Sequence, residues 1–152
     1  MRVAETLTAL SDAQFAAMQG ETFVLLHTID AETGSPTTNA ISWIFAPNPS
    51  VLRFAVDGRS RLVANLKNNP AVAVTLFAGG TVQAVYGTAS VVTDALEGVP
   101  FRLVCFDIAI SAVRDAMFYG ARLTALPEYE KTYDKRAADK LDGQVFEAMK
   151  KA

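Results

Sequence analysis

The sequence contains little cysteine and little histidine. Its 152 residues include one cysteine, Cys105, and one histidine, His27. A single cysteine excludes an internal disulfide bond and is typical of a reducing compartment, so we expect a cytoplasmic protein. The two residues are too few for a zinc site built from histidine and cysteine ligands. His27 lies among apolar residues of an expected strand, which favours a structural role. Cys105 lies in an apolar stretch, which favours a buried thiol.

The glycine motifs of three large enzyme classes are also absent. The sequence contains no Gly-x-Gly-x-x-Gly, no Gly-x-x-x-x-Gly-Lys-Ser/Thr and no Gly-x-Ser-x-Gly. These absences argue against a Rossmann dinucleotide site, a P-loop and an α/β-hydrolase nucleophile elbow. A Ser-His-Asp arrangement stays open, because one histidine is enough for it.

Neither charge nor hydropathy indicates a nucleic-acid or membrane partner. The formal net charge is −2 at pH 7, and a slightly acidic chain lacks the basic surface that binds nucleic acid or anionic lipid. Residues 1–20 show no signal-peptide pattern. The most apolar window, residues 99–119, is broken by four charged residues. It therefore predicts a buried helix that ends at Gly120, and not a membrane span.

Strand-forming segments separated by turn residues fill the first two thirds of the chain. They are residues 22–28, 37–45, 51–56, 71–78 and 81–92. Short strands joined by tight turns are typical of an antiparallel barrel or meander. Gly79-Gly80 has the composition of a hairpin turn. Gly87, inside the last of these strands, indicates a bulge or a close approach of another backbone.

Helix signals flank the strands. Ser11 and Gln14 fit the capping box of a helix that ends at Gly20. Pro127 can open a helix as its first residue. Apolar residues then recur at helical spacing towards the C-terminus, through a break at residues 142–143.

The length fits one domain, and a hydrophobic fraction of 51% favours an oligomer with a buried interface. The sequence predicts a single domain over residues 1–152 that is mainly β with flanking helices. In this prediction an antiparallel barrel occupies about residues 20–92, and a helical C-terminal third occupies about residues 94–152.

The stretch at residues 54–70 (FAVDGRSRLVANLKNNP) carries the best candidate for a binding site. It predicts the end of a strand, a polar turn and a short helix with Ser60 as its N-cap and Pro70 as its stop. A helix entered through Arg59, Ser60 and Arg61 presents backbone N–H groups, a hydroxyl and two guanidinium groups. Such donors can hold a phosphate. The alternative is a polar surface turn without a ligand.

Several short segments occur in a characteristic order along residues 8–92. They are Pro36, the stretch 39–43 (NAISW), residues 54–57 (FAVD), Ser60-Arg61, Asn65-Leu66, residues 69–72 (NPAV) and residues 85–89 (VYGTA). In this order they resemble the pyridoxamine 5′-phosphate oxidase-like family of FMN-binding split barrels. The resemblance implies an antiparallel split β-barrel and a homodimer that holds FMN in the cleft between its subunits.

The resemblance also implies roles for individual residues. Ser60 and Arg61 would bind the FMN phosphate, and Gln83 would reach the ring or the ribityl chain. Two strand segments would line the isoalloxazine ring through their backbone groups. Their residues are Asn39, Ala40, Ile41, Ser42, Trp43, Ala55 and Val56. Trp43 on its own is open to two interpretations, a core residue or the border of a ligand pocket.

Three departures separate this sequence from a pyridoxamine 5′-phosphate oxidase proper. Leu62 stands where the oxidase has a lysine, and Asn39-Ala40 stands where it has an arginine. No histidine follows His27, so the arginine-and-histidine segment that grips the vitamin substrate has no match. The resemblance therefore does not imply oxidation of pyridoxamine phosphate.

We expect an FMN-dependent oxidoreductase, of the flavin reductase or oxidase kind, that acts on an unassigned small molecule. One alternative is a reductase that uses the deazaflavin F420. Another is a non-catalytic protein that binds flavin or haem as a sensor, and a third is a barrel with an empty cleft. The absorption spectrum of the purified protein would separate these hypotheses.

Overall fold

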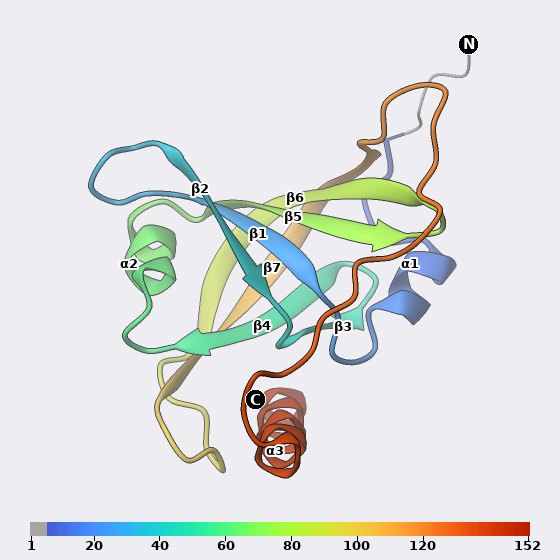
Figure 1. Cartoon of the computed structure of the whole chain (residues 1–152). Helices are drawn as coiled ribbons and strands as arrows, with labels where there is room; N and C mark the ends of the chain where they lie inside the picture. Colours follow the sequence, from blue (N-terminus) through green and yellow to red (C-terminus); the bar gives the residue numbers. More distant parts are fainter. Residues whose placement is uncertain (1–5) are drawn as a thin grey trace.

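A computed structural model describes residues 6–152 of the chain (Figure 1). These residues contain the strands of one sheet and a few helices. In chain order they are α1 (Asp12–Ala17), β1 (Val24–Ile29), β2 (Pro36–Ile41), β3 (Ile44–Asn48), β4 (Val51–Asp57), α2 (Arg61–Asn68), β5 (Ala71–Ala78), β6 (Thr81–Thr93), β7 (Leu103–Asp115) and α3 (Lys135–Lys151).

The strands form one antiparallel sheet of seven strands in the order β2-β1-β5-β6-β7-β4-β3. The two edge strands, β2 and β3, follow each other in the chain and are linked only by Ser42 and Trp43. The sheet curves round so that its edges approach each other, but it does not close (Figure 1). This confirms the predicted class, a mainly β split barrel with flanking helices.

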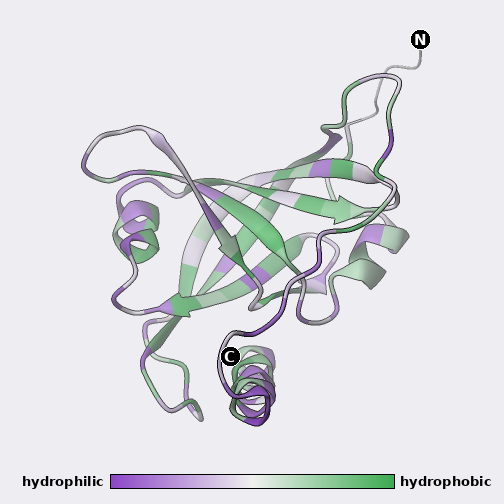
Figure 2. Ribbon diagram, in the orientation of Figure 1, coloured by the Kyte–Doolittle hydropathy of each residue, from purple (hydrophilic) through white to green (hydrophobic). Residues whose placement is uncertain are grey.

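The inner face of the sheet encloses the main hydrophobic core. Alternate residues of the strands point inward, as the burial pattern of β1 shows. Phe54 and Phe106 stack at the centre with ring centroids 5.3 Å apart, and both are fully buried. Figure 2 shows hydrophobic residues in green along much of the sheet. Burial of these side chains is the main stabilising contribution to the barrel.

The predicted helix at residues 99–119 is wrong, because the structure has the strand β7 there. Val104, Phe106 and Ile108 face the barrel interior. Leu103 and Cys105 face outward, where α3 covers them. A strand buried on both faces has a nearly continuous apolar sequence, and such a run resembles a buried helix. The sheet therefore extends well beyond the predicted barrel boundary near residue 92.

The predicted strand at residues 37–45 is two strands in the structure. The chain turns at Ser42 and Trp43 and passes from one edge of the sheet to the other. β3 then continues through Pro47, which the sequence placed in a turn. This proline is tolerated because β3 is an edge strand and its pairing with β4 shifts register between Phe45 and Asn48.

The first helix was predicted correctly at its start and too long at its end. The Ser11–Gln14 capping box is present, with Gln14 N 3.2 Å from Ser11 Oγ and Ser11 N 2.8 Å from Gln14 Oε1. The helix ends at Ala17 with Met18 as its C-cap, so Gly20 is not its stop.

The C-terminal helix begins later than predicted. Asp134 caps α3 by accepting a hydrogen bond from Ala137 N, and the helix continues through Gly143 without a break. Residues 116–134, which we name the crossing segment, contain Pro127 but no helix or strand. Figure 1 shows this segment, in orange, running from the end of β7 in front of the sheet to α3.

Both glycine predictions within the barrel are confirmed. Gly79 and Gly80 have φ values of +65° and +73° and turn the chain between β5 and β6. At Gly87 the pairing of β6 with β7 shifts register. A Cβ atom there would lie 2.4 Å from the carbonyl oxygen of Ala109. Only glycine lets the two backbones approach so closely.

Candidate functional site

Two adjoining pockets open beside the β2 edge of the sheet. The hairpin pocket, of about 510 Å³, is lined by Asp30, Thr33, Ser35, Pro36, Thr37, Thr38, Asn39, Ser60, Arg61, Leu62 and Asn65. The edge pocket, of about 370 Å³, is lined by Asn39, Ala40, Ile41, Ser42, Trp43, Ala55, Val56, Asp57, Ser60, Leu62 and Lys131. The pockets share Asn39, Ser60 and Leu62, so they form one groove.

The N-terminus of α2 lies where the two pockets meet. Ser60 is its N-cap, as predicted, and its hydroxyl accepts a hydrogen bond from Leu62 N at 3.2 Å. The hydroxyl proton stays available to a ligand, because a serine oxygen can accept and donate at the same time. The helix ends with Asn69 as its C-cap, before Pro70.

Asn65 fixes this helix against the hairpin that links β1 and β2. Its side chain donates to Thr28 Oγ1 at 3.1 Å and accepts from Ala31 N at 2.9 Å. Asn65 is buried, so both bonds are protected from water. They hold the β1–β2 hairpin next to the first turn of α2, which shapes the hairpin pocket.

Arg61 points into the hairpin pocket and already has a carboxylate partner. Its Nη2 lies 2.9 Å from Asp30 Oδ1 and 4.0 Å from Glu32 Oε2, while 73% of the side chain is exposed. Thr33 donates to the second carboxylate oxygen of Asp30 through both its N–H and its hydroxyl. These bonds from Thr33, and then Arg61, hold the pKa of Asp30 below its ordinary value.

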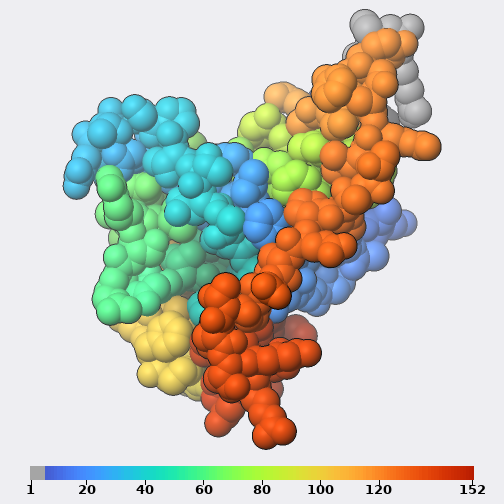
Figure 3. Space-filling view, viewed as in Figure 1, coloured from blue at the N-terminus to red at the C-terminus, as the bar shows by residue number. Residues whose placement is uncertain are grey.

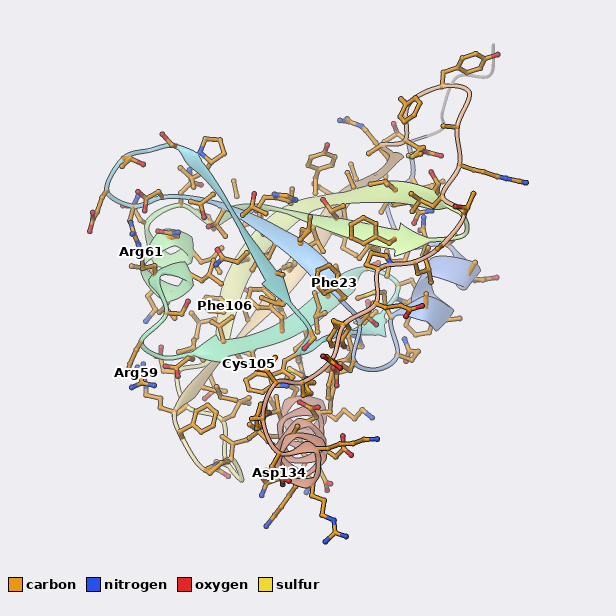
Figure 4. All side chains as sticks on the ribbon, viewed as in Figure 1. Phe23, Arg59, Arg61, Cys105, Phe106 and Asp134 are labelled. Carbon is orange, nitrogen blue, oxygen red and sulfur yellow. The ribbon has the colours of Figure 1, made fainter. Side chains whose placement is uncertain are left out.

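Arg59 is the more exposed of the two arginines. Its side chain is 92% exposed, lies outside both pocket linings and pairs with Asp57 at 3.1 Å. The hydrogen bonds from Arg59 lower the pKa of Asp57. Figure 4 shows Arg59 and Arg61 on the same side of the molecule, near the start of α2.

Most side chains that line the edge pocket are uncharged, and several of them are apolar. As an edge strand, β2 pairs with β1 alone, which leaves a row of its N–H and C=O groups without a strand partner. Trp43 borders this pocket, and its Nε1 donates to Asp142 Oδ1 at 2.8 Å. Trp43 thus borders a pocket and also packs on the cluster beneath α3.

Lys131 also lines the edge pocket, which the sequence did not predict. It comes from the crossing segment, and its ammonium lies 3.0 Å from Glu21 Oε1 and 3.3 Å from Asp142 Oδ2. Partial burial lowers the pKa of Lys131, but the two carboxylates outweigh this effect and raise it. No local motif marks this lysine, because only the fold brings it near the β2 edge.

The structure brings together every predicted cofactor-binding residue except Gln83. The other residues of the predicted set line the hairpin pocket or the edge pocket. Gln83 lies outside both linings, and its Oε1 accepts a hydrogen bond from Gln14 Nε2 at 2.6 Å. The role of each residue towards a cofactor stays a prediction.

The single histidine and cysteine lie outside the groove. The two ring nitrogens of His27 lie 3.1 Å from Thr38 Oγ1 and 2.7 Å from Thr75 Oγ1. Cys105 is fully buried, and this burial raises the pKa of its thiol to about 11.

Within residues 6–152 no cluster of three or more histidine, cysteine, aspartate or glutamate side chains is placed to hold a metal ion. None of the helices there is long and apolar enough to cross a membrane.

The sequence model of the family described as pyridoxamine 5′-phosphate oxidase matches residues 10–115. The match covers more than half of the chain and includes the barrel and most of the groove. The chain belongs to this family. No curated protein matches the sequence.

Solved structures share the fold at low sequence identity. A protein from Lactobacillus delbrueckii that is provisionally assigned as a pyridoxamine 5′-phosphate oxidase is 21% identical. Its TM-score is 0.60 over 72% of this chain and 97% of that protein. A protein named F420 reductase is 18% identical, with a TM-score of 0.58 over 68% and 98%. General stress protein 26 from Bacillus anthracis is also 18% identical, with a TM-score of 0.53 over 68% and 91%. These likenesses confirm the fold, and they do not specify the cofactor.

The residues of the groove fit a flavin nucleotide of the kind the family implies. The Ser60 hydroxyl, the Arg61 guanidinium and the first turn of α2 are donors suited to a phosphate. The edge pocket offers main-chain polar groups and apolar walls, which suit a flat heteroaromatic ring. Asp30 and Glu32 are the unfavourable features, because they place negative charge beside the phosphate donors.

Proposed function

We propose that this protein binds FMN in the groove and acts as an FMN-dependent oxidoreductase on a small molecule. The observation that carries the proposal is the continuity of the groove. Its hairpin pocket has the donors for a phosphate, and its edge pocket has the walls for a ring, with Ser60 and Leu62 between them. The match to the family supports the same assignment.

In this proposal Ser60 and Arg61 hold the phosphate end of the cofactor. Main-chain groups of residues 39–43 and 55–56 orient the ring and exclude water from one of its faces. FMN, when bound, supplies the redox chemistry by accepting and passing on electrons. The three sequence departures argue against pyridoxamine phosphate as the substrate, so the substrate is a different small molecule.

The proposal includes a homodimer. Members of this family are commonly dimeric, and one chain leaves the groove open on one side. Side chains such as Tyr86 and Val91 also expose apolar surface on the barrel. Sedimentation at micromolar concentration is expected to give a species of twice the 16.3 kDa chain mass. A monomer alone would contradict this part of the proposal.

A cytoplasmic location stays a prediction from the single cysteine.

A deazaflavin such as F420 is the second candidate cofactor. Leu62 removes one cation from the phosphate end, and Asp30 and Glu32 add negative charge there. Both features reduce the preference for a dianionic phosphate over a phosphodiester, which carries one charge. The fold similarity to a protein named F420 reductase is consistent with this candidate.

Haem is disfavoured as the cofactor. A haem iron needs an axial ligand from the protein, usually histidine, cysteine, methionine or tyrosine. Both ring nitrogens of His27 are within hydrogen-bonding distance of threonines, and Cys105 is fully buried beneath α3. None of these four residue types is among the described residues that line the groove.

The absorption spectrum of the purified protein, loaded with FMN and then mixed with NADH or NADPH, tests the proposed function. Bound flavin bands that bleach on reduction and return with an acceptor are the expected result. If FMN binds but neither NADH nor NADPH reduces it, the protein binds the cofactor, and the proposed redox activity with these donors is contradicted. Failure to bind FMN, together with tight binding of F420, would replace FMN by the deazaflavin.

A further inference from the structure

We propose that Lys131 is a cofactor-contacting residue, whose ammonium stabilises the reduced, negatively charged form of the ring bound in the edge pocket. This inference rests on the proposed function, and it assigns to the crossing segment a role in tuning the cofactor. Figure 3 shows that segment, in orange, on the surface of the molecule above α3.

Lys131 is the single cationic side chain that lines the edge pocket among the described residues. Asp57 is the other charged residue of that lining, and Arg59 pairs with it. Within one chain, the positive charge nearest to a ring in the edge pocket is therefore that of Lys131. Arg61 lines only the hairpin pocket.

Its neighbours hold Lys131 in place. Glu21 and Asp142 bind the ammonium at 3.0 and 3.3 Å, and the side chain is only 25% exposed. Asp142 also accepts from Trp43 Nε1, so the same carboxylate orients a wall of the pocket and its cation. Tyr129 donates to Glu21, and its ring lies 5.7 Å from the ammonium.

These contacts leave Lys131 with a spare donor. An ammonium group has three N–H donors. One binds Glu21 at 3.0 Å, and Asp142 needs only one more, which its two oxygens share at 3.3 and 3.5 Å. The third can donate to an electron-rich oxygen or nitrogen of a ring in the edge pocket. Reduction of a flavin places negative charge on its pyrimidine portion, so a charged donor binds the reduced form more tightly than the oxidised form.

A purely structural role is the competing explanation, because Lys131 also ties the crossing segment to α3. Tyr129→Phe supplies the matched control. This variant removes a hydrogen bond between the crossing segment and Glu21 and keeps the ammonium. If Lys131 only holds the segment, both variants should change flavin binding in the same way and leave the ratio of reduced to oxidised affinity unchanged.

The test is the reduction potential of FMN bound to the wild-type protein, Lys131→Met and Tyr129→Phe. We expect Lys131→Met to lose about tenfold in the affinity for reduced over oxidised FMN, as for a lost hydrogen bond to a charged group. For a two-electron couple this equals a potential about 30 mV more negative. Tyr129→Phe and Lys131→Arg should keep the wild-type potential.

Bound FMN with an unchanged potential in Lys131→Met would overturn the inference and leave the proposed function intact. If the wild-type protein binds no FMN, both proposals fail, and the spectrum distinguishes the two cases. Should Lys131→Met not fold, Lys131→Gln removes the charge and keeps a donor. We expect it to lower the potential as well, and an unchanged value there would also overturn the inference.

Discussion

The guanidinium of Arg61 lies 2.9 Å from a carboxylate oxygen of Asp30. The side chain best placed to bind a phosphate is therefore already paired with a carboxylate. Thr33 holds that carboxylate from its other side, so Asp30 is fixed while most of Arg61 stays exposed. A phosphate must share Arg61 with Asp30 or displace it, and Asp30 becomes a determinant of affinity.

We expect Asp30→Asn to strengthen FMN binding about fivefold, because it removes a negative charge beside the phosphate donors and water screens much of that repulsion. Thr33 and Arg61 bind different oxygens of Asp30, so asparagine can keep the acceptor for Thr33 while its NH2 group no longer accepts from Arg61. Riboflavin, which lacks the phosphate, should bind both proteins equally. Titration by flavin fluorescence measures both effects. Weaker FMN binding by Asp30→Asn would show that Asp30 positions Arg61 for the phosphate and does not compete for it.

The same carboxylate predicts a sensitivity to acid. Thr33 and Arg61 lower the pKa of Asp30 in the folded state, so its charged form stabilises the fold. This contribution is complete above the unfolded pKa of about 3.9 and is lost as the pH falls through the folded value. Denaturant titrations across this range should show a shallower acid loss of unfolding free energy for Asp30→Asn than for the wild type. Identical slopes would contradict the assignment.

Two glycine substitutions should have opposite effects on stability. Gly87→Ala places a Cβ atom 2.4 Å from the Ala109 carbonyl oxygen, so we expect it to destabilise the fold by about 1–3 kcal/mol or more. Gly143→Ala meets no atom within 4 Å and lies inside α3. It should stabilise the fold by about 0.5–1 kcal/mol. Urea denaturation measures both, and a neutral Gly87→Ala would contradict the close approach of β6 and β7.

Cys105 should be unreactive in the folded protein. It is fully buried beneath α3, and burial raises its pKa to about 11, so the reactive thiolate is scarce at neutral pH. Thiol reagents should label it only after denaturation. Fast labelling of the native protein would show that α3 leaves the sheet readily.

The sequence predicted those parts of the fold that depend on local signals. Ser60 as a helix cap, the turn at Gly79-Gly80 and the bulge at Gly87 follow from the conformations that these residues favour. β7 was mistaken for a helix because α3 covers its outer face. That contact joins segments far apart in the chain, and no local pattern records it.

The candidate site was predictable to a similar extent. Asn39, Trp43 and Arg61 were found because they lie within ordered segments shared with a family. Lys131 and Asp30 were missed, because each acts through a partner distant in sequence. The strand residues that line the groove could be inferred from the sequence, but the charged side chains around them required the structure.

The central claim is that the hairpin pocket binds the phosphate of FMN. The most direct measurement compares FMN and riboflavin binding by the wild type, Arg61→Ala and the control Arg59→Ala, whose side chain is 92% exposed and lies outside the groove. A hydrogen bond to a charged group contributes about 1.5–3 kcal/mol. Arg61→Ala should therefore weaken FMN binding about ten- to a hundredfold. Riboflavin binding should stay equal in all three proteins, and Arg59→Ala should match the wild type. If Arg61→Ala binds FMN as tightly as the wild type, the phosphate does not bind here and the account is contradicted.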